Sequence, residues 1–134
     1  MKSGQTAYSL IELLLALAIL GILLAVSYPS YQRHVLRSYR AEAMADLLLL
    51  ANSLEQYRAD NGSYSDNFTE LGRPTLSESG RYEFTITLSE AGQAFVVTAD
   101  ALGVQRADTE CGQFSLNQFG QRNTSGTYPV SCWH

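Results

Sequence analysis

The feature that most constrains this chain is an apolar segment near its amino terminus. Between Leu13 and Gln32 there is no charged residue, and the run that leads into this stretch holds one acid, Glu12. The segment is apolar on every helical side, which is typical of a buried or membrane-embedded helix rather than an amphipathic surface helix. Tyr8 to Tyr28 is 21 residues, enough to cross the hydrocarbon core of a bilayer at about 1.5 Å per residue.

Three kinds of segment fit this pattern: a cleaved secretory signal, a plain membrane anchor and a specialised export segment. A secretory signal is disfavoured because the apolar run of such signals is usually only about 7–15 residues long. The run in this chain is longer and carries an acid near its start. A plain anchor is disfavoured by Glu12, because a carboxylate costs about 2.5–3.5 kcal/mol at the centre of a membrane and less near an end. Glu12 is therefore either tolerated at the interface or functional.

Residues 2–13, Lys-Ser-Gly-Gln-Thr-Ala-Tyr-Ser-Leu-Ile-Glu-Leu, resemble the type III signal and N-methylation motif of type IV pilins. That family has a short polar, basic leader, then a small residue, an aromatic residue and a Thr/Ser-Leu-Ile-Glu-Leu run. The resemblance implies a leader peptide at residues 1–7, cleavage between Ala7 and Tyr8 by a prepilin peptidase, and N-methylation of Tyr8. Ala7 stands where most of the family have glycine.

The same resemblance assigns roles within the hydrophobic helix expected at residues 8–29. Glu12 becomes the fifth residue of the mature chain, and the resemblance implies that it acts in assembly. A carboxylate in hydrocarbon must be neutralised or paired, so pairing with the α-amine of a neighbouring subunit would set the subunit register. Gly21 and Pro29 fall where many pilins carry helix-weakening residues, and Pro29 either kinks the helix or bends it at the membrane surface.

The charges that flank the apolar segment disagree with a pilin orientation. Lys2 precedes the segment, whereas a basic stretch follows it, so the positive-inside rule places the C-terminal domain in the cytoplasm. Pilins carry that domain outside, and we give the motif more weight because more of its features match. Helical spacing puts Arg33, Arg37 and Arg40 on one face. Lipid headgroups or acidic residues of neighbouring subunits are the favoured partners of this face, ahead of nucleic-acid phosphate.

Residues 30–134 are predicted to form one exported α+β headpiece, in which a helix packs on a small antiparallel sheet. An amphipathic helix is expected over 30–60, a loop over 61–80 and a sheet with a disulfide loop over 81–134. Strands are predicted at 82–88, 95–99 and 111–116. The helix stripe consists of Leu36, Tyr39, Ala43, Leu47, Leu50, Leu54 and Tyr57.

The two cysteines, Cys111 and Cys132, are 21 positions apart. A bridge between them would stabilise the domain by about 3 kcal/mol, and export favours the bridge over two free buried thiols. A C-terminal disulfide loop is similar to that of type IV pilins. The Cys132-Trp133 ending, together with Gly-Gln-Phe-Ser-Leu-Asn after Cys111, resembles PilE-like minor pilins and their relatives that receive DNA.

Residue types that support catalysis are scarce. His34 and His134 are the only histidines, and no Gly-rich phosphate loop or His-Glu-x-x-His motif occurs, so no enzyme activity, cofactor or metal is expected. Asp100, Asp108 and Glu110 offer three carboxylates for Ca²⁺, but we interpret them as solvated loop acids.

Three functions are compatible with these features. The favoured one is a minor pilin, first held in the inner membrane by one span with its C-terminal domain in the periplasm, then part of an extracellular fibre used for twitching motility, adhesion or DNA uptake. A type II secretion pseudopilin is the close alternative, although the disulfide and the Cys-Trp ending weigh against it. The third function is a pilus-borne DNA receptor.

DNA binding is possible but not favoured on charge. Residues 41–134 hold five arginines against twelve acids, whereas DNA binding depends on cations that neutralise phosphates. A local basic patch would form only if folding gathered Arg73, Arg81, Arg106 and Arg122.

Overall fold

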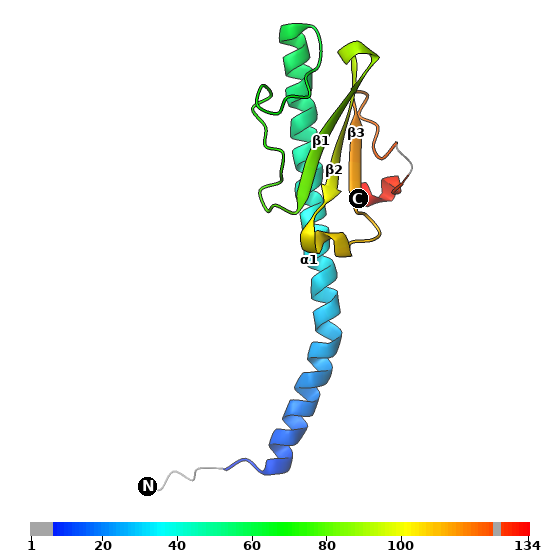
Figure 1. Cartoon of the computed structure of the whole chain (residues 1–134). Coiled ribbons are helices and arrows are strands. Elements are labelled where there is room, and N and C mark those ends of the chain that lie inside the picture. The colour runs from blue at the N-terminus through cyan, green and yellow to red at the C-terminus, as the bar shows by residue number, and fades with distance from the viewer. Residues whose placement is uncertain (1–6, 125–126) are drawn as a thin grey trace. The chain divides into compact units, whose positions relative to one another are not determined.

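The structure is a computed structural model that describes residues 7–124 and 127–134. In these residues a long helix, α1 (Leu10–Asn61), is followed by the strands β1 (Tyr82–Ser89), β2 (Ala94–Ala101) and β3 (Gln113–Asn117) (Figure 1). Short 3₁₀ helices lie at η1 (Glu90–Gly92), η2 (Gly103–Ala107) and η3 (Val130–Trp133). The chain divides within α1 into two compact parts: the first ends at Val35 and the second begins at Leu36. We call Leu36–His134 the headpiece and describe each part by itself.

The start of α1 is set by Ser9. The Ser9 carbonyl accepts the backbone N–H groups of Glu12 and Leu13 at 3.1 and 3.2 Å, and its Oγ accepts the Glu12 N–H at 3.3 Å. Serine is among the preferred N-cap residues, and the charge of Glu12 in the first turn complements the helix dipole. The helix continues without interruption through Gly21 and Pro29, so the kink at Pro29 stays a prediction.

The other end of α1 lies where the sequence predicts it. Gly62 adopts φ +84° and donates its N–H to the Arg58 carbonyl at 2.7 Å, which is the left-handed glycine ending common in helices. The following loop is tied to α1 by polar contacts: Ser79 Oγ donates to Glu42 Oε2 at 2.7 Å, and Arg73 Nε donates to Ser53 Oγ at 2.8 Å. Residues 62–81, between α1 and β1, contain one isolated bridge, between Leu76 and Glu83.

The three strands form an antiparallel sheet in the order β1-β2-β3. β1 pairs with β2 from Tyr82 opposite Ala101 to Ser89 opposite Ala94. The first two strands are confirmed, slightly longer than predicted. The third begins at Gln113, not at Cys111, because Cys111 lies in a bend and is joined to Cys132 outside the sheet.

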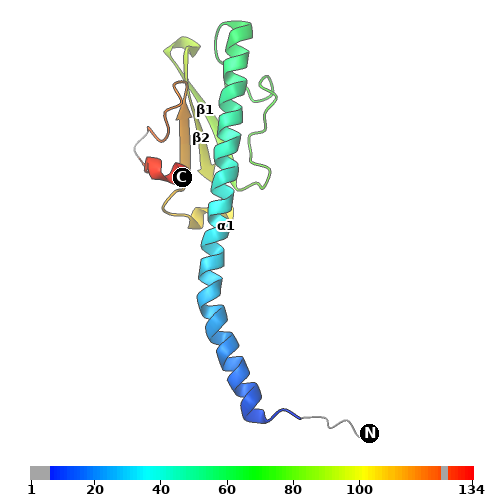
Figure 2. The same ribbon diagram turned by 180° about the vertical axis from the view of Figure 1, so that it is seen from behind.

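The C-terminal part of α1 lies along one face of this sheet, as Figures 1 and 2 show from opposite sides. The headpiece core lies between them. Ala43, Leu47, Leu50 and Leu54 are buried, which confirms the centre of the predicted stripe. They pack in one cluster with alternate residues of the strands. The buried strand residues include Tyr82, Phe84, Ile86, Phe95, Val97, Phe114 and Leu116. Because burying one such side chain stabilises the fold by about 1.5–3 kcal/mol, this face explains why the helix and sheet associate.

Candidate functional site

The largest functional feature is the apolar first half of α1. The large apolar side chains between Leu10 and Val26 are 52–79% exposed in the single chain. Among the described residues, α1 is the one helix that is long and apolar enough to cross a membrane. Exposure of this surface to water costs about 25 cal/mol of free energy for each Å² of apolar area, compared with burial. The segment therefore requires a lipid or protein environment.

The predicted processing residues lie just before this helix. Ala7 and Tyr8 are exposed and non-helical, and Ser9 then caps α1. Most of the leader, residues 1–6, lies outside the described residues. Glu12 is exposed in the first turn of α1. Cleavage after Ala7, methylation of Tyr8 and the assembly role of Glu12 stay predictions.

An ion pair joins α1 to Asp108, the residue that follows η2, inside the headpiece. Arg40 Nη2 donates to Asp108 Oδ1 at 2.6 Å, and Arg40 Nε donates to the other carboxylate oxygen. The two side chains are only 14% and 3% exposed. The hydrogen bond with Asp108 raises the pKa of Arg40 above its usual value, as expected for a two-pronged guanidinium–carboxylate contact. Two interpretations were therefore wrong: Asp108 is not a solvated loop acid, and Arg40 does not belong to a free basic face.

A buried amide extends this contact into the core. Gln105 Nε2 donates to the Leu36 carbonyl and to the Tyr82 hydroxyl, both at 3.0 Å. Burial raises the pKa of Tyr82 to about 12, because the phenolate form would lose its hydration. Sequence reasoning missed this cluster. The available signal was that Arg40 falls on the same helical stripe as Leu36 and Ala43.

The other two candidate calcium ligands are also accounted for. Asp100 Oδ1 accepts the Gln113 Nε2–H at 2.6 Å, and the Glu110 side chain is 83% exposed, 3.9 Å from Arg40 Nη2. The described residues contain no group of three His, Cys, Asp or Glu side chains arranged to hold a metal. Asp108 and Glu110 thus both lie beside Arg40, and Asp100 is bound to Gln113.

The predicted disulfide is present. Cys111 and Cys132 are bonded, with their Cα atoms 5.7 Å apart. The next residue, Trp133, donates its indole N–H to Asn123 Oδ1 at 3.0 Å and packs edge-on against Phe114, with the ring centres 5.7 Å apart. The disulfide and Trp133 together attach the C-terminal segment to the sheet.

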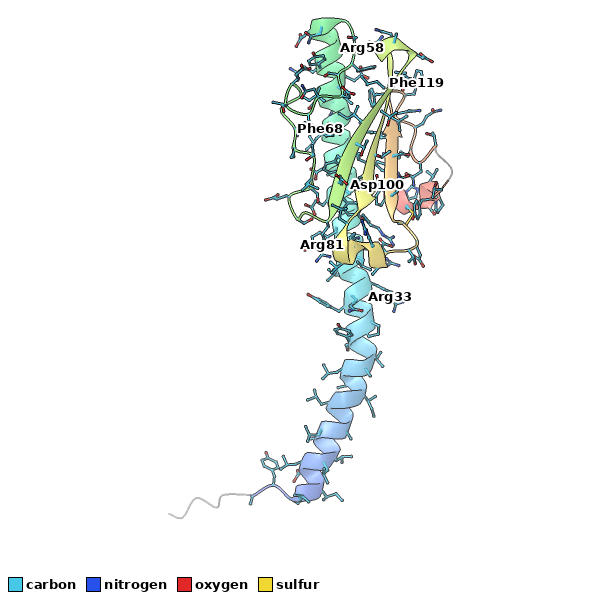
Figure 3. All side chains as sticks on the ribbon, in the orientation of Figure 1. Arg33, Arg58, Phe68, Arg81, Asp100 and Phe119 are labelled. Carbon is cyan, nitrogen blue, oxygen red and sulfur yellow. A yellow bond between two sulfur atoms is a disulfide. The ribbon has the colours of Figure 1, made fainter. Side chains whose placement is uncertain are left out.

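The four arginines that would form a basic patch if folding gathered them contact different parts of the headpiece. Arg81 stacks over the Tyr39 ring at 3.9 Å and Arg122 over the Trp133 ring at 4.9 Å. Arg73 is held on Ser53 of α1, while Arg106 lies in η2. Figure 3 places Arg58 and Arg81 at opposite ends of the headpiece. Arg81 and Arg106 do lie on neighbouring segments, since the Arg81 carbonyl accepts the Leu102 N–H at 2.7 Å.

Sequence reasoning also missed a surface hollow of about 280 Å³ between α1 and the end of β3. Beside it, Phe119 is 78% exposed on a turn that Asn117 holds through its side chain. The lining residues are Leu48, Ala51, Asn52, Glu55, Phe95, Leu116, Asn117, Gln118, Gly120 and Arg122.

Two family models match adjoining parts of the chain. Residues 2–28 match the prokaryotic N-terminal methylation motif. Residues 29–115 match the family described as type IV minor pilin ComP, DNA uptake sequence receptor.

Known proteins agree with these matches. The chain is 32% identical to the fimbrial protein EcpC of Eikenella corrodens, over 74% of this chain and 64% of that protein. It is 30% identical to the type IV major pilin PilA of Myxococcus xanthus, over 84% of this chain and 50% of that protein. The chain thus spans about half to two thirds of the length of these relatives.

A solved structure of a type IV pilin from Shewanella oneidensis matches with a TM-score of 0.57 and 25% identity, over 74% of this chain and 98% of that one. The fold, the N-terminal motif and the headpiece match therefore agree. The chain belongs to the type IV pilin family, with a headpiece of the ComP-like DNA-uptake receptor type.

Proposed function

We propose that this chain is a minor pilin that is cut after Ala7, methylated on Tyr8 and assembled into a type IV pilus through the first half of α1. The observation that carries the proposal is the first half of α1, which is exposed on all sides, is apolar from Leu13 to Val26, and has its single acid, Glu12, in the first turn. A membrane supplies the environment for this helix before assembly, and neighbouring apolar helices supply it in a fibre. Type IV pilins are structural subunits, and we assign no enzymatic role to this one.

The proposed route fixes where the headpiece resides. The first half of α1 spans the inner membrane once, with the headpiece in the periplasm, and both then move to the extracellular fibre. The Cys111–Cys132 bond supports this placement, since disulfides persist in oxidising compartments. The basic stretch after the span opposes it under the positive-inside rule. We give more weight to the methylation motif because it matches the whole of residues 2–28.

Replacing Glu12 tests the assembly step. Glu12→Gln keeps the shape of the side chain but removes the charge that would pair with a neighbouring α-amine. We expect at least tenfold less of this variant in fibres sheared from the cell, with an unchanged amount in the membrane. Ser9→Ala is the matched control, because it removes a capping contact of the same helix turn without changing charge. Wild-type incorporation of Glu12→Gln would contradict the proposed role.

The copy number tests the word minor. A minor pilin should form a small fraction of the pilin mass in sheared fibres, whereas the two relatives described above include a protein named as a major pilin. Quantitative mass spectrometry of sheared fibres gives this ratio directly. A dominant share for this chain would make it the principal subunit instead.

DNA binding is the second candidate function, and the family match over residues 29–115 favours it. The headpiece presents arginines without forming one broad basic face, so any DNA contact must use a small surface. Arg81 and Arg106 lie on neighbouring segments, and we assign the phosphate contacts to this pair.

Filter binding of the full chain in non-ionic detergent tests this function. If the chain binds duplex DNA through Arg81 and Arg106, affinity falls with salt, and Arg81→Gln with Arg106→Gln lowers the log–log salt slope by about two. Arg73→Gln is the control, since Arg73 is engaged with Ser53. Absence of any salt-dependent affinity would remove the DNA function and leave the pilin function standing.

A further inference from the structure

The residues that follow the apolar segment form an ordered series along α1. Tyr28 and Tyr31 are exposed, at 63% and 67%, and the Tyr28 hydroxyl accepts the Gln32 Nε2–H at 2.9 Å. Arg33 and Arg37 follow, both exposed. The Arg33 side chain, labelled in Figure 3, projects outward from the helix. Apolar, aromatic and basic side chains thus succeed one another within about three turns.

The spacing of this series matches the layers of a bilayer. At about 1.5 Å per residue, Arg33 lies about 10 Å beyond Val26 along the helix. The headgroup region on each side of a bilayer is about 5–8 Å thick. Tyr28 and Tyr31 fall within that region, where tyrosines concentrate because their rings are apolar and their hydroxyls polar. Arg33 lies just beyond it, and helical side chains tilt toward the N-terminus, so this long side chain extends back toward the phosphates.

Pro29 supports the same depth. Proline has no N–H, so the carbonyl four residues earlier, that of Ala25, receives no hydrogen bond from the backbone at position 29. An unpaired carbonyl is costly in hydrocarbon and is readily hydrated at the interface. The Arg33 side chain meanwhile donates from Nε to the Pro29 carbonyl at 3.4 Å, which leaves its terminal nitrogens for other acceptors.

The charges of the stretch define the ligand. From Leu13 to Ala41 the chain holds Arg33, His34, Arg37 and Arg40 and no acid. Arg40 is committed to Asp108, so Arg33 and Arg37 are the arginines that face outward there. A carboxylate of the same stretch cannot compete for them, because there is none.

We propose that Tyr28, Tyr31 and Arg33 form a collar that binds the headgroups of anionic phospholipids around the membrane-held subunit. The inference rests on the membrane stage of the proposed function, and adds a lipid partner that a hydrophobic span alone does not require. Its consequence is that the membrane pool of the subunit is held by anionic lipid as well as by apolar burial. Each arginine near the surface of an anionic membrane strengthens binding to that membrane about fivefold.

Native mass spectrometry of the full chain tests the collar. The chain is released from detergent micelles that contain equal amounts of phosphatidylglycerol and phosphatidylcholine, and the retained lipids are counted. We expect the wild type to retain phosphatidylglycerol in at least fivefold excess. Arg33→Gln should lower that excess about fivefold. The matched control is Arg58→Gln, which removes one exposed headpiece charge and should leave the excess unchanged.

Three results would overturn the collar. The first is equal retention of the two lipids by the wild type, and the second is an equal loss of preference in the control variant. The third is an unchanged lipid preference in the collar variant together with weaker DNA binding, which would make Arg33 a nucleic-acid contact. None of these results bears on processing or fibre incorporation, so failure of the collar is distinguishable from failure of the pilin function.

Discussion

At the scale of single residues, the contact between Arg40 and Asp108 holds together positions that are 68 residues apart. Gln105 lies beside it and donates to both Leu36 and Tyr82. This cluster fixes η2 against α1 at one end of the headpiece. Removing one partner of a buried ion pair leaves the other charge without compensation, which is much more costly than losing an exposed pair.

Asp108→Asn should therefore lower the free energy of unfolding of the headpiece by about 2–4 kcal/mol. Urea unfolding of the full chain in detergent, followed by Trp133 fluorescence, measures the change. Glu110→Gln is the matched control, because Glu110 is exposed and reaches Arg40 only at 3.9 Å, and it should change stability by less than about 0.5 kcal/mol. Equal effects of the two variants would show that the buried pair contributes no more than the exposed one.

Tyr82 makes stability depend on alkaline pH. Its pKa is raised to about 12 in the folded chain, against about 10 when unfolded. Below pH 10 the hydroxyl is protonated in both states. Between pH 10 and 12 the unfolded chain loses this proton first, so rising pH favours unfolding.

The unfolding free energy of the wild type should fall by about 2 kcal/mol more than that of Tyr82→Phe between pH 10 and 12. Urea unfolding at these two pH values, monitored by far-ultraviolet circular dichroism, gives the difference. A parallel decline of both proteins would mean that Tyr82 ionises equally easily in the folded and unfolded chain.

At the scale of elements, the C-terminal segment depends on the sheet to which it is attached. The disulfide joins the residue two positions before β3 to η3, and Trp133 packs on Phe114 of that strand. Without the bond, the segment would still have the hydrogen bonds of Asn123 with Trp133 and with the Pro129 carbonyl, and the contacts of the Trp133 ring with Phe114 and Arg122.

Replacing Cys111 and Cys132 together by serine should lower the unfolding free energy by about 3 kcal/mol, because the unfolded chain regains the freedom of the closed loop. Urea midpoints with and without reductant give the value. Reductant should shift the wild type toward the double variant and leave the double variant unchanged. A reduced wild type with an unshifted midpoint would contradict this role of the bond.

Elements that depend on local patterns could be predicted from the sequence, whereas the cluster around Arg40 could not. The alternation from Tyr82 to Leu88 and the stripe from Ala43 to Leu54 follow from the periods of strand and helix, and both are confirmed. The partner of Arg40 depends on where η2 packs, which no local pattern encodes. The third strand was placed two residues early because a buried cysteine reads like a strand residue until its bond is known.

At the scale of the whole molecule, two parts of one chain face different requirements. The headpiece has its own core and disulfide, while the first half of α1 leaves its apolar surface uncovered. An exposed apolar surface of this size marks a site of membrane or protein contact, so lipid or neighbouring helices must cover it. Membrane anchoring followed by assembly supplies both in turn.

The intact mass of the protein in fibres sheared from the cell surface tests this account most directly. We predict a species that begins at Tyr8, carries one additional methyl group and lacks two hydrogens because of the Cys111–Cys132 bond. That single mass reports cleavage, methylation, oxidation and presence in the fibre. A chain that begins at Met1, or a processed chain found in the membrane and never in sheared fibres, would contradict the proposed role as a pilus subunit.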